Sequence, residues 1–186
     1  MYFQTSRLLV RDPVSDDWMG VHAFLSDPHV MRWIHLGPEP YTPEQTRAWI
    51  HDIMLHNQTV PRTSHNSIIL EAETQSVIGW IGIGKPSHPE YGDLDFGYAL
   101  RHDRWGRGYM TEVVTGLLDF AFASLEGSVV YAECETTNTG SYRVMEKAGM
   151  TRIETFNAFY EPHDQPLEVY RYAVSRESWT NSRVAP

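Results

Sequence analysis

The segment 93–134 constrains the fold of this 186-residue chain most, because it reads as strand, helix and strand in succession. The runs "DLDFGYAL" (93–100) and "SVVYAEC" (128–134) have the composition of strands. Between them, "TEVVTGLLDFAFASL" (111–125) repeats apolar residues at helical spacing. A helix that links two strands of one sheet makes them parallel, through a right-handed crossover in nearly all cases. The segment therefore predicts a parallel pair of strands.

The rest of the chain adds further strands and covering helices. A first strand is expected in "SRLLVRD", followed by helices within 15–33 and 42–58. The runs "SIILEAE" and "VIGWIGIGK" flank the short polar "TQS" and predict a hairpin, while "TRIETFNAFY" and "EVYRYAVS" predict two closing strands. Hairpins are antiparallel, so the expected architecture is a mixed sheet with helices packed on it. No linker or repeat divides the chain, so a single domain, 1–186, is expected.

Several helix boundaries are marked by particular residues. Ser15 is the expected N-cap of the first helix, and Pro28 should break that helix into two short pieces. Thr42 precedes Pro43 at the first helical position and Gln45 at the third, which is a capping-box pattern. Each of these residues predicts where the chain changes conformation.

Composition narrows the possible partners. The formal net charge is −9, which argues against broad binding to nucleic acid but leaves room for one small anion held by local dipoles. Cys134 is the single cysteine, so no internal disulfide can form. The first residues, "MYFQTSRLLVRD", lack the apolar core of a signal peptide, and no apolar run is long enough to span a bilayer. We expect a cytoplasmic protein.

Nine histidines raise the question of a metal site. His51 and His56 are five residues apart and would not share a helical face. The sequence contains no H-E-x-x-H motif and no close His/Asp cluster is evident in it. We therefore expect no metal.

The stretch "RHDRWGRGYMTE" (101–112) resembles a phosphate-binding loop in its glycine content. A Walker loop is excluded because the G-x-x-x-x-G-K-[ST] pattern is absent, and a dinucleotide fingerprint would need glycine where Thr111 stands. A third interpretation is a tight turn into a helix, whose free backbone N–H groups attract an anion, with help from Arg104 and Arg107. The alternative is an ordinary turn in which Gly106 and Gly108 only allow the backbone conformation and bind no ligand.

Several motifs in order resemble the GNAT superfamily of acyl-CoA-dependent N-acetyltransferases. They are "DFGYAL", "RWGRGYMTE" and "NTGSYRVMEKAGM", supported by "TSRLLVRD", "YTPEQTRAWI", "VIGWIGI" and "EVYRYAVSRESW", the last resembling the closing strand and the turn after it. Within the superfamily they are similar to the branch of bacterial ribosomal-protein N-terminal acetyltransferases. Trp105 and Met110 depart from the general [QR]-x-x-G-x-[GA] signature, as is familiar in that branch.

The resemblance implies a fold. It is an α+β protein with a mixed, mostly antiparallel sheet of about seven strands, splayed between two parallel strands, and with helices on both faces. A bulge near Gly97 would help the sheet to splay.

The resemblance also implies acetyl-CoA as co-substrate and names its contacts. Backbone amides in the loop should bind the pyrophosphate, and the strand edge should pair with the pantetheine arm, which Asn138 also touches. The implied cofactor-binding residues are Tyr98, Leu100, Trp105, Gly106, Arg107, Gly108, Met110, Thr111, Asn138 and Ser141.

Amine acetylation needs a stabilised oxyanion, an acid for the leaving thiolate and a deprotonated amine. The resemblance assigns the first task to the backbone N–H near Leu100. Many members use a tyrosine acid at the position of Met145, which cannot act, whereas the ribosomal-protein branch has a serine at the position of Ser141. Ser141 is thus the expected acid, directly or through water. The alternatives are that its hydroxyl only caps the helix, or that neighbouring Tyr142 acts.

The base and the acceptor are less constrained. Asp95 and Glu133 are the main candidate bases, with Glu135 beside them. The alternative is transfer without a base, because a peptide α-amine is already partly neutral near pH 8. Trp33 and His35 lie where the family binds its acceptor, although Trp33 could equally be helix core.

The expected function is acetyl transfer to a protein N-terminal α-amine or a small-molecule amine, by a monomer or homodimer without nucleic acid or membrane partners. A catalytically silent CoA-binding regulatory or scaffold protein is the alternative, and a nucleotide-binding module is a weaker third.

Overall fold

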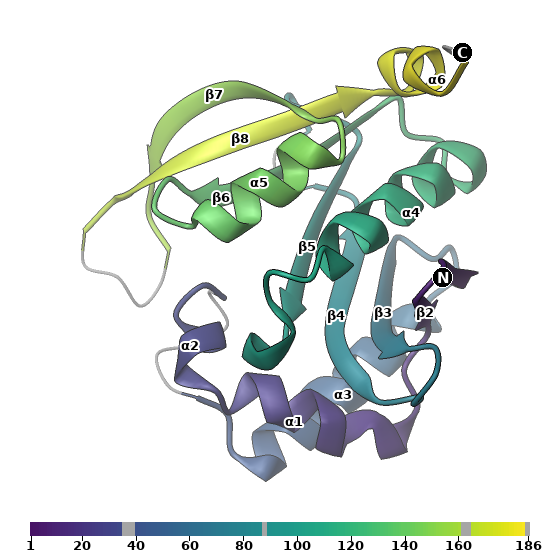
Figure 1. Ribbon diagram of the computed structural model, residues 1–186, viewed down its shortest axis with the longest axis vertical. Helices are drawn as coiled ribbons and strands as arrows, with labels where there is room; N and C mark the ends of the chain where they lie inside the picture. Colours follow the sequence, from purple (N-terminus) through teal and green to yellow (C-terminus); the bar gives the residue numbers. More distant parts are fainter. Residues whose placement is uncertain (35–39, 87–88, 161–164, 185–186) are drawn as a thin grey trace.

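The computed structural model describes residues 1–34, 40–86, 89–160 and 165–184 (Figure 1). Eight strands form one sheet in the order β1-β2-β3-β4-β5-β6-β8-β7. The strands are β1 (Phe3–Gln4), β2 (Leu8–Arg11), β3 (Ser64–Glu71), β4 (Val77–Gly84), β5 (Leu94–Leu100), β6 (Val129–Glu135), β7 (Thr151–Ala158) and β8 (Leu167–Ser175). The expected mixed, mostly antiparallel sheet is confirmed. The additional strand is the two-residue β1, which is too short to give a periodic signal.

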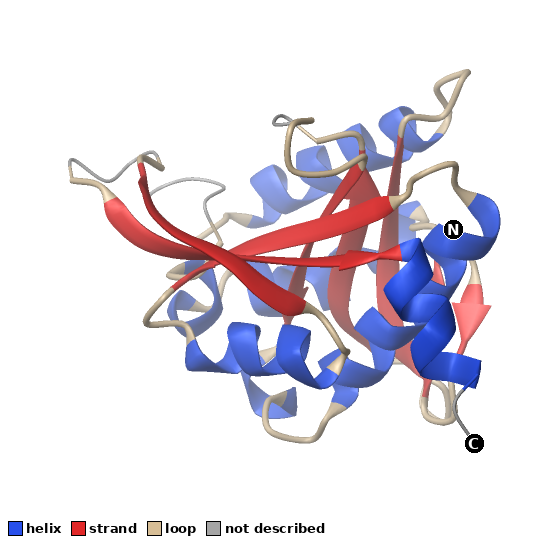
Figure 2. Cartoon of the chain, turned by 90° about the horizontal axis from the view of Figure 1, so that it is seen from above, coloured by secondary structure: helices blue, strands red, loops and turns tan. Residues whose placement is uncertain are grey.

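The parallel pair predicted from residues 93–134 is present but very short. β5 and β6 pair only at Leu94 with Val130 and at Asp95 with Tyr131. Beyond Asp95, β5 stays paired with β4 as far as Leu100, while β6 continues beside β8 as far as Glu135. The two halves of the sheet therefore separate, and seen from above their strands run at a steep angle to one another (Figure 2).

Helices cover both faces of the sheet, as expected. On one face lie α1 (Trp18–Leu25), α2 (Pro28–Met31) and α3 (Pro43–Asn57), which pack on β3 and β4. On the other lie α4 (Tyr109–Ser124) and α5 (Thr139–Lys147), with α6 (Arg176–Val184) at the end. Two 3-10 turns, η1 (Ser15–Asp17) and η2 (His102–Arg104), complete the fold. In the described ranges no helix combines the length and apolarity that crossing a bilayer requires.

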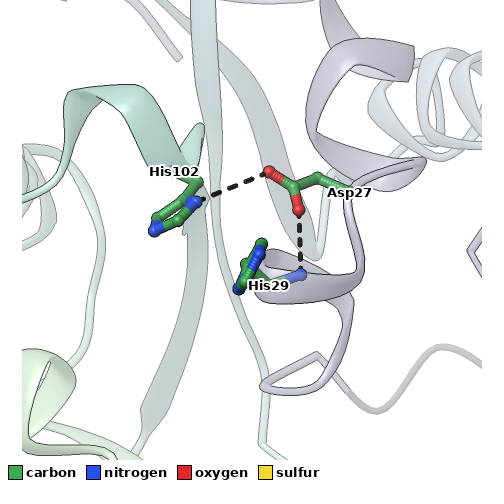
Figure 3. A group of neighbouring side chains, drawn as sticks. All are labelled: Asp27, His29 and His102. Atoms are coloured by element: carbon green, nitrogen blue, oxygen red, sulfur yellow. Dashed lines mark hydrogen bonds and ion pairs between the residues drawn. The ribbon is translucent and has the colours of Figure 1, made fainter.

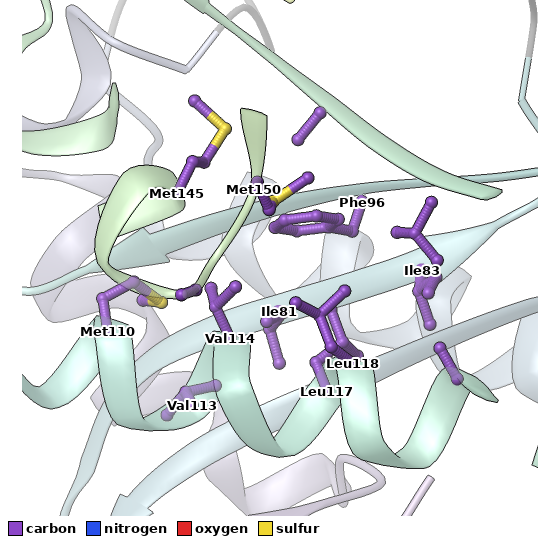
Figure 4. Close-up of a cluster of buried hydrophobic side chains, with 14 of the residues drawn as sticks. Ile81, Ile83, Phe96, Met110, Val113, Val114, Leu117, Leu118, Met145 and Met150 are labelled. Atoms are coloured by element: carbon purple, nitrogen blue, oxygen red, sulfur yellow. The ribbon is translucent and has the colours of Figure 1, made fainter. Parts of the chain in front are cut away.

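The larger core lies between α4 and the sheet. Figure 4 shows Val114 and Leu118 of α4 facing Ile81 and Phe96 of β4 and β5. Met145 of α5 is fully buried at the edge of the same cluster. This packing anchors the N-terminal end of α4, and with it the glycine loop, against the strands that splay.

Two of the expected helix boundaries are confirmed and one is wrong. Thr42 and Gln45 form the capping box, and Pro28 begins a new helix after α1 ends at Leu25. Ser15, however, is not an N-cap but the first residue of η1. Val14 is the N-cap of η1, and its N–H donates to the Asp17 carboxylate at 2.8 Å. Asp17 in turn is the N-cap of α1.

Two further expectations need correction. β5 passes Gly97 opposite Gly82 without a register shift, so it has no bulge in its pairing with β4 there; the shifts lie near Ile69 and Arg152 instead. The sheet splays because β6 leaves β5. The segment after the closing strand is the helix α6 and not a turn.

Glu112 in the first turn of α4 ties the glycine loop to the N-terminal strands. Its carboxylate accepts hydrogen bonds from the Thr5 hydroxyl and from the backbone N–H and Nε of Arg7, the last two at 3.0 and 2.7 Å. Arg7 also donates to the carbonyl of Arg107 at 3.1 Å. Burial opposes ionisation of Glu112, but the bonds from Thr5 and Arg7 outweigh it, and its pKa lies below the usual value.

We predict that Glu112→Gln lowers the free energy of unfolding by about 1–3 kcal/mol at pH 7, because the donors of Thr5, Ser6 and Arg7 lose a charged acceptor. A depressed folded-state pKa stabilises only above the unfolded-state pKa, about 4.3, and that stabilisation is lost as the pH falls through the folded-state value. The gap between wild type and variant should therefore shrink below about pH 4. Urea unfolding of both proteins at pH 7 and pH 3.5 measures this difference in the free energy of unfolding. Glu73→Gln, at an exposed position, is the control, and an equal loss there would contradict the assignment.

Candidate active site

A cavity of about 1190 Å³ opens where β5 and β6 separate. Its lining comes from β5, the loop before α4, β6, α5 and the end of β7. Of the predicted site residues it includes Trp33, Asp95, Tyr98, Leu100, Trp105, Gly106, Gly108, Met110, Thr111, Glu133, Asn138 and Ser141. The fold thus gathers segments up to about a hundred residues apart around one space. Arg107 is exposed and does not line it, and His35 lies outside the described residues.

The glycine loop presents backbone N–H groups to this cavity. Gly106 and Gly108 have φ of 73° and 75°, the left-handed conformation that favours glycine. A Cβ at Gly106 would meet no protein atom within 4 Å. The first intrahelical bond of α4 after its N-cap runs from Glu112 N–H to Gly108 O, so the N–H groups of Met110 and Thr111 have no acceptor within the helix. An anion placed here would meet these amides and the positive end of a 16-residue helix.

The arginine of the loop that lines the cavity is already neutralised by protein carboxylates. Arg104 is paired with Glu71, Nε to Oε1 at 3.0 Å, and with Asp103 through a second contact. Its guanidinium is therefore held on the β3 side of the loop. An anion at this loop would therefore meet backbone N–H groups and not the paired guanidinium of Arg104.

The end of β5 directs backbone groups into the splay. The N–H of Arg101 donates to Ile78 O in β4 at 2.8 Å. Because successive N–H groups of a strand point to opposite sides, the N–H groups of Leu100 and Tyr98 face away from β4. The carbonyl of Leu100, on that same side, accepts a hydrogen bond from Trp105 Nε1 at 2.8 Å. Beyond Asp95, β5 thus has a free edge to which an extended ligand could add.

Ser141 and Tyr98 meet in the cavity wall. The Asn138 side chain caps α5 by accepting from Ser141 N–H at 3.1 Å, so the Ser141 hydroxyl is not the cap. That hydroxyl lies 2.8 Å from the Tyr98 hydroxyl, which also lies 3.1 Å from Ser141 O. Burial raises the pKa of Tyr98 far above 10 and keeps the phenol protonated. Burial likewise raises the pKa of neighbouring Cys134 to about 11, so its thiol stays neutral.

The two candidate bases occupy different environments. Glu133 accepts from Arg171 Nε at 2.8 Å and from the Tyr160 hydroxyl at 3.1 Å, one to each oxygen. Arg171 is buried, with its guanidinium 3.4 Å from the ring centre of Tyr91. Asp95 is the last residue of β5 that pairs with β6, and the sheet begins to open after it. Both carboxylates line the cavity.

The side of the cavity away from the glycine loop is aromatic. Trp33 lines it, and the guanidinium of Arg32 lies 4.3 Å from its ring centre. Trp80, Tyr91, Phe156, Phe159 and Tyr160 add further rings.

Sequence reasoning missed two features of the site. Tyr98 was expected to contribute only through its backbone, so the role of its hydroxyl was not predicted. The contacts of Glu133 with Arg171 and Tyr160 were not predicted either. Residue spacing carries no signal for either. They arise from the packing of α5 on the splayed sheet and from the register of β6 with β8.

Comparison with known proteins places this geometry in a family. The family model described as "Acetyltransferase (GNAT) domain" matches residues 7–151. An uncharacterized N-acetyltransferase of Bacillus subtilis, YnaD, is 26% identical over 96% of this chain and 99% of its own length. The crystal structure of a GNAT-family acetyltransferase from Bacillus anthracis superposes with a TM-score of 0.80 at 28% identity, covering 95% of this chain and 99% of that one.

A more distant structure shares the fold. It is a spermidine N-acetyltransferase from Vibrio cholerae, solved with CoA and spermine, with a TM-score of 0.76 at 15% identity over 95% of this chain and all of that one. Structures named as ribosomal-protein and aminoglycoside acetyltransferases share it as well, so the likeness does not single out the ribosomal-protein branch. The match over residues 7–151, together with the splayed sheet and its glycine loop, shows that the chain belongs to the acetyltransferase (GNAT) family and is an acyltransferase.

Proposed function

We propose that the protein transfers the acetyl group of acetyl-CoA directly to a primary amine, with both substrates bound together. The free edge of β5 beside the glycine loop carries this proposal. It offers an extended row of backbone groups for the pantetheine arm and, at one end, a cluster of amides for the pyrophosphate. The cavity is large enough to admit an amine from the aromatic side, where Trp33 would contact it.

In this proposal the N–H of Leu100 donates to the thioester carbonyl and stabilises the oxyanion that forms when the amine attacks. The C–N bond forms, the C–S bond breaks, and the thiolate takes a proton from the Ser141 hydroxyl, which regains one from solvent as the amine releases its own. The Tyr98 hydroxyl, 2.8 Å from Ser141 Oγ, supports that transfer.

The attacking amine must first lose a proton. Both oxygens of Glu133 are already engaged by protein donors, one by Arg171 and the other by Tyr160. We therefore assign the removal of the amine proton to Asp95 or to solvent. Glu133 instead holds Arg171 and Tyr160 in the cavity wall.

The acceptor is a protein N-terminal α-amine or a small-molecule amine. The aromatic rings that line the cavity can contact a cationic amine through their faces. A catalytically silent CoA-binding protein is not favoured, because the family members compared are named as acetyltransferases.

We predict that Gly106→Ala weakens acetyl-CoA binding at least tenfold. A left-handed residue with a Cβ costs about 1–2 kcal/mol, and that Cβ projects into the space proposed for the pyrophosphate. Calorimetry gives the affinity, and thermal unfolding shows whether the fold survives. Ser124→Ala, at the exposed far end of α4, should bind normally. Unchanged affinity for acetyl-CoA in the Gly106 variant would show that this loop does not bind the pyrophosphate.

We predict that Ser141→Ala lowers kcat by about 100-fold, the usual contribution of a general acid, while KM for acetyl-CoA changes little. Tyr98→Phe should lower kcat less, because it supports the acid without replacing it. The measurement is thiol release over a panel of peptide and small amines. Ser124→Ala, at an exposed serine of α4, is the matched control and should keep full activity. Full activity of Ser141→Ala would assign the acid to another group.

A further inference from the structure

Asp27, His29 and His102 meet outside the cavity (Figure 3). Within the described part of the chain they are the one group of three His, Cys, Asp or Glu residues whose ligand atoms all lie within 4.8 Å of one another. The sequence pattern did not reveal this group, because His102 is remote from the other two residues in the chain. His102 lies 73 or more residues from the other two, and only the fold brings it there.

The three side chains come from two separate elements. Asp27 is the N-cap of α2 and His29 is the second residue of that helix, while His102 begins η2 after β5. The rings of His29 and His102 lie 4.5 Å apart, centre to centre, at 30°. Asp27 uses Oδ1 to accept from His29 N–H at 2.8 Å, and its Oδ2 lies 4.0 Å from His102 Nδ1. One carboxylate oxygen therefore serves the helix and the other faces the imidazole.

Local structure holds the donors near their positions. Pro28 and the Asp27 cap set the start of α2, so the position of His29 relative to Asp27 is constrained. On the other side, the ring of His102 packs edge-on against Trp105 at 4.6 Å. Both histidines are exposed and Asp27 is half-buried, so an ion could enter from solvent.

We propose that Asp27, His29 and His102 form a binding site for a divalent transition metal of the zinc type. Two imidazoles and one carboxylate are a donor set that Zn²⁺ accepts, with a further position left for water or another ligand. At Zn–ligand distances of about 2.0–2.2 Å, tetrahedral donors lie about 3.3 Å apart. The present donors reach that spacing if they approach by up to about 1.5 Å, a change that rotation of exposed side chains can supply.

Such an ion would join the two sides of the cavity entrance. α2 leads to Trp33 on the aromatic side, and η2 leads to the glycine loop. Trp105, which packs on His102, donates to Leu100 O at the end of β5. Metal binding would therefore restrain α2 against the strand end without occupying the cavity.

The test is titration of the untagged protein with ZnCl₂ by calorimetry, with the visible absorption of bound Co²⁺ as a spectroscopic readout. We expect one ion per chain. At Zn²⁺ a hundredfold above its Kd, Tm should rise by about 5–10 °C. None of these readouts requires acetyl transfer. A negative result would therefore contradict the metal site without bearing on the proposed acetyltransferase activity.

His29→Ala and His102→Ala should each abolish the Co²⁺ spectrum and the rise in Tm. Asp27→Asn keeps an equally good helix cap but removes the charge, so it should weaken binding at least tenfold while the metal-free Tm stays the same. His51→Ala, an exposed histidine on α3, is the control and should bind as wild type. Absence of binding at 1 mM Zn²⁺, on the order of the weakest specific sites, would overturn the proposal. Binding that survives His102→Ala but is lost in Cys134→Ala would overturn it as well.

Discussion

The separation of β5 and β6 after two paired residues is the constraint on which the site depends. A parallel pair would normally continue, because each unpaired backbone group of a buried strand is costly. Here β6 follows β8 and β5 follows β4, so the inner edge of β5 is left facing a cavity of about 1190 Å³. The crossover through α4 returns the chain to this opening, and it places a helix N-terminus beside the free edge.

Several arginines near the glycine loop and the cavity are paired with carboxylates of the protein. Arg104 pairs with Glu71 and Asp103, and Arg7 pairs with Glu112, so these side chains stabilise the loop. The amides at the start of α4 then face the cavity. On the opposite side Arg171 is neutralised by Glu133 and Glu154, which keeps a cation buried among aromatic rings without leaving its charge unpaired.

The same splay governs the polar pair of Tyr98 and Ser141. Tyr98 lies on the part of β5 that has left β6, and α5 packs across the opening so that its first turn reaches the phenol. Because Asn138 caps α5, the serine hydroxyl is available to Tyr98. A similar division of labour occurs at Asp27, where one oxygen caps α2 and the other faces His102.

Local patterns in the sequence were sufficient for most of the fold. The β-rich and helical runs, the capping box at Thr42, the break at Pro28 and the glycine loop each depend on residues a few positions apart, and the parallel pair follows from chain topology. The two-residue β1 and the cap at Val14 could not be predicted this way. β1 is too short for a pattern, and Asp17 bonds to Val14 while it is also held by Arg11 at 2.7 Å.

Only the tertiary structure decided what the site residues contact. Ser141 and Tyr98 are 43 residues apart, Glu133 and Arg171 are 38 apart, and His102 is remote from Asp27. Such contacts are set by strand register, by the angle at which the sheet opens and by helix packing, none of which leaves a periodic trace in the chain. The sequence by itself therefore determined the elements, their order and the loop that begins α4. The fold determined which side chains are hydrogen-bonded, which are neutralised, and which two histidines and one carboxylate meet at the surface.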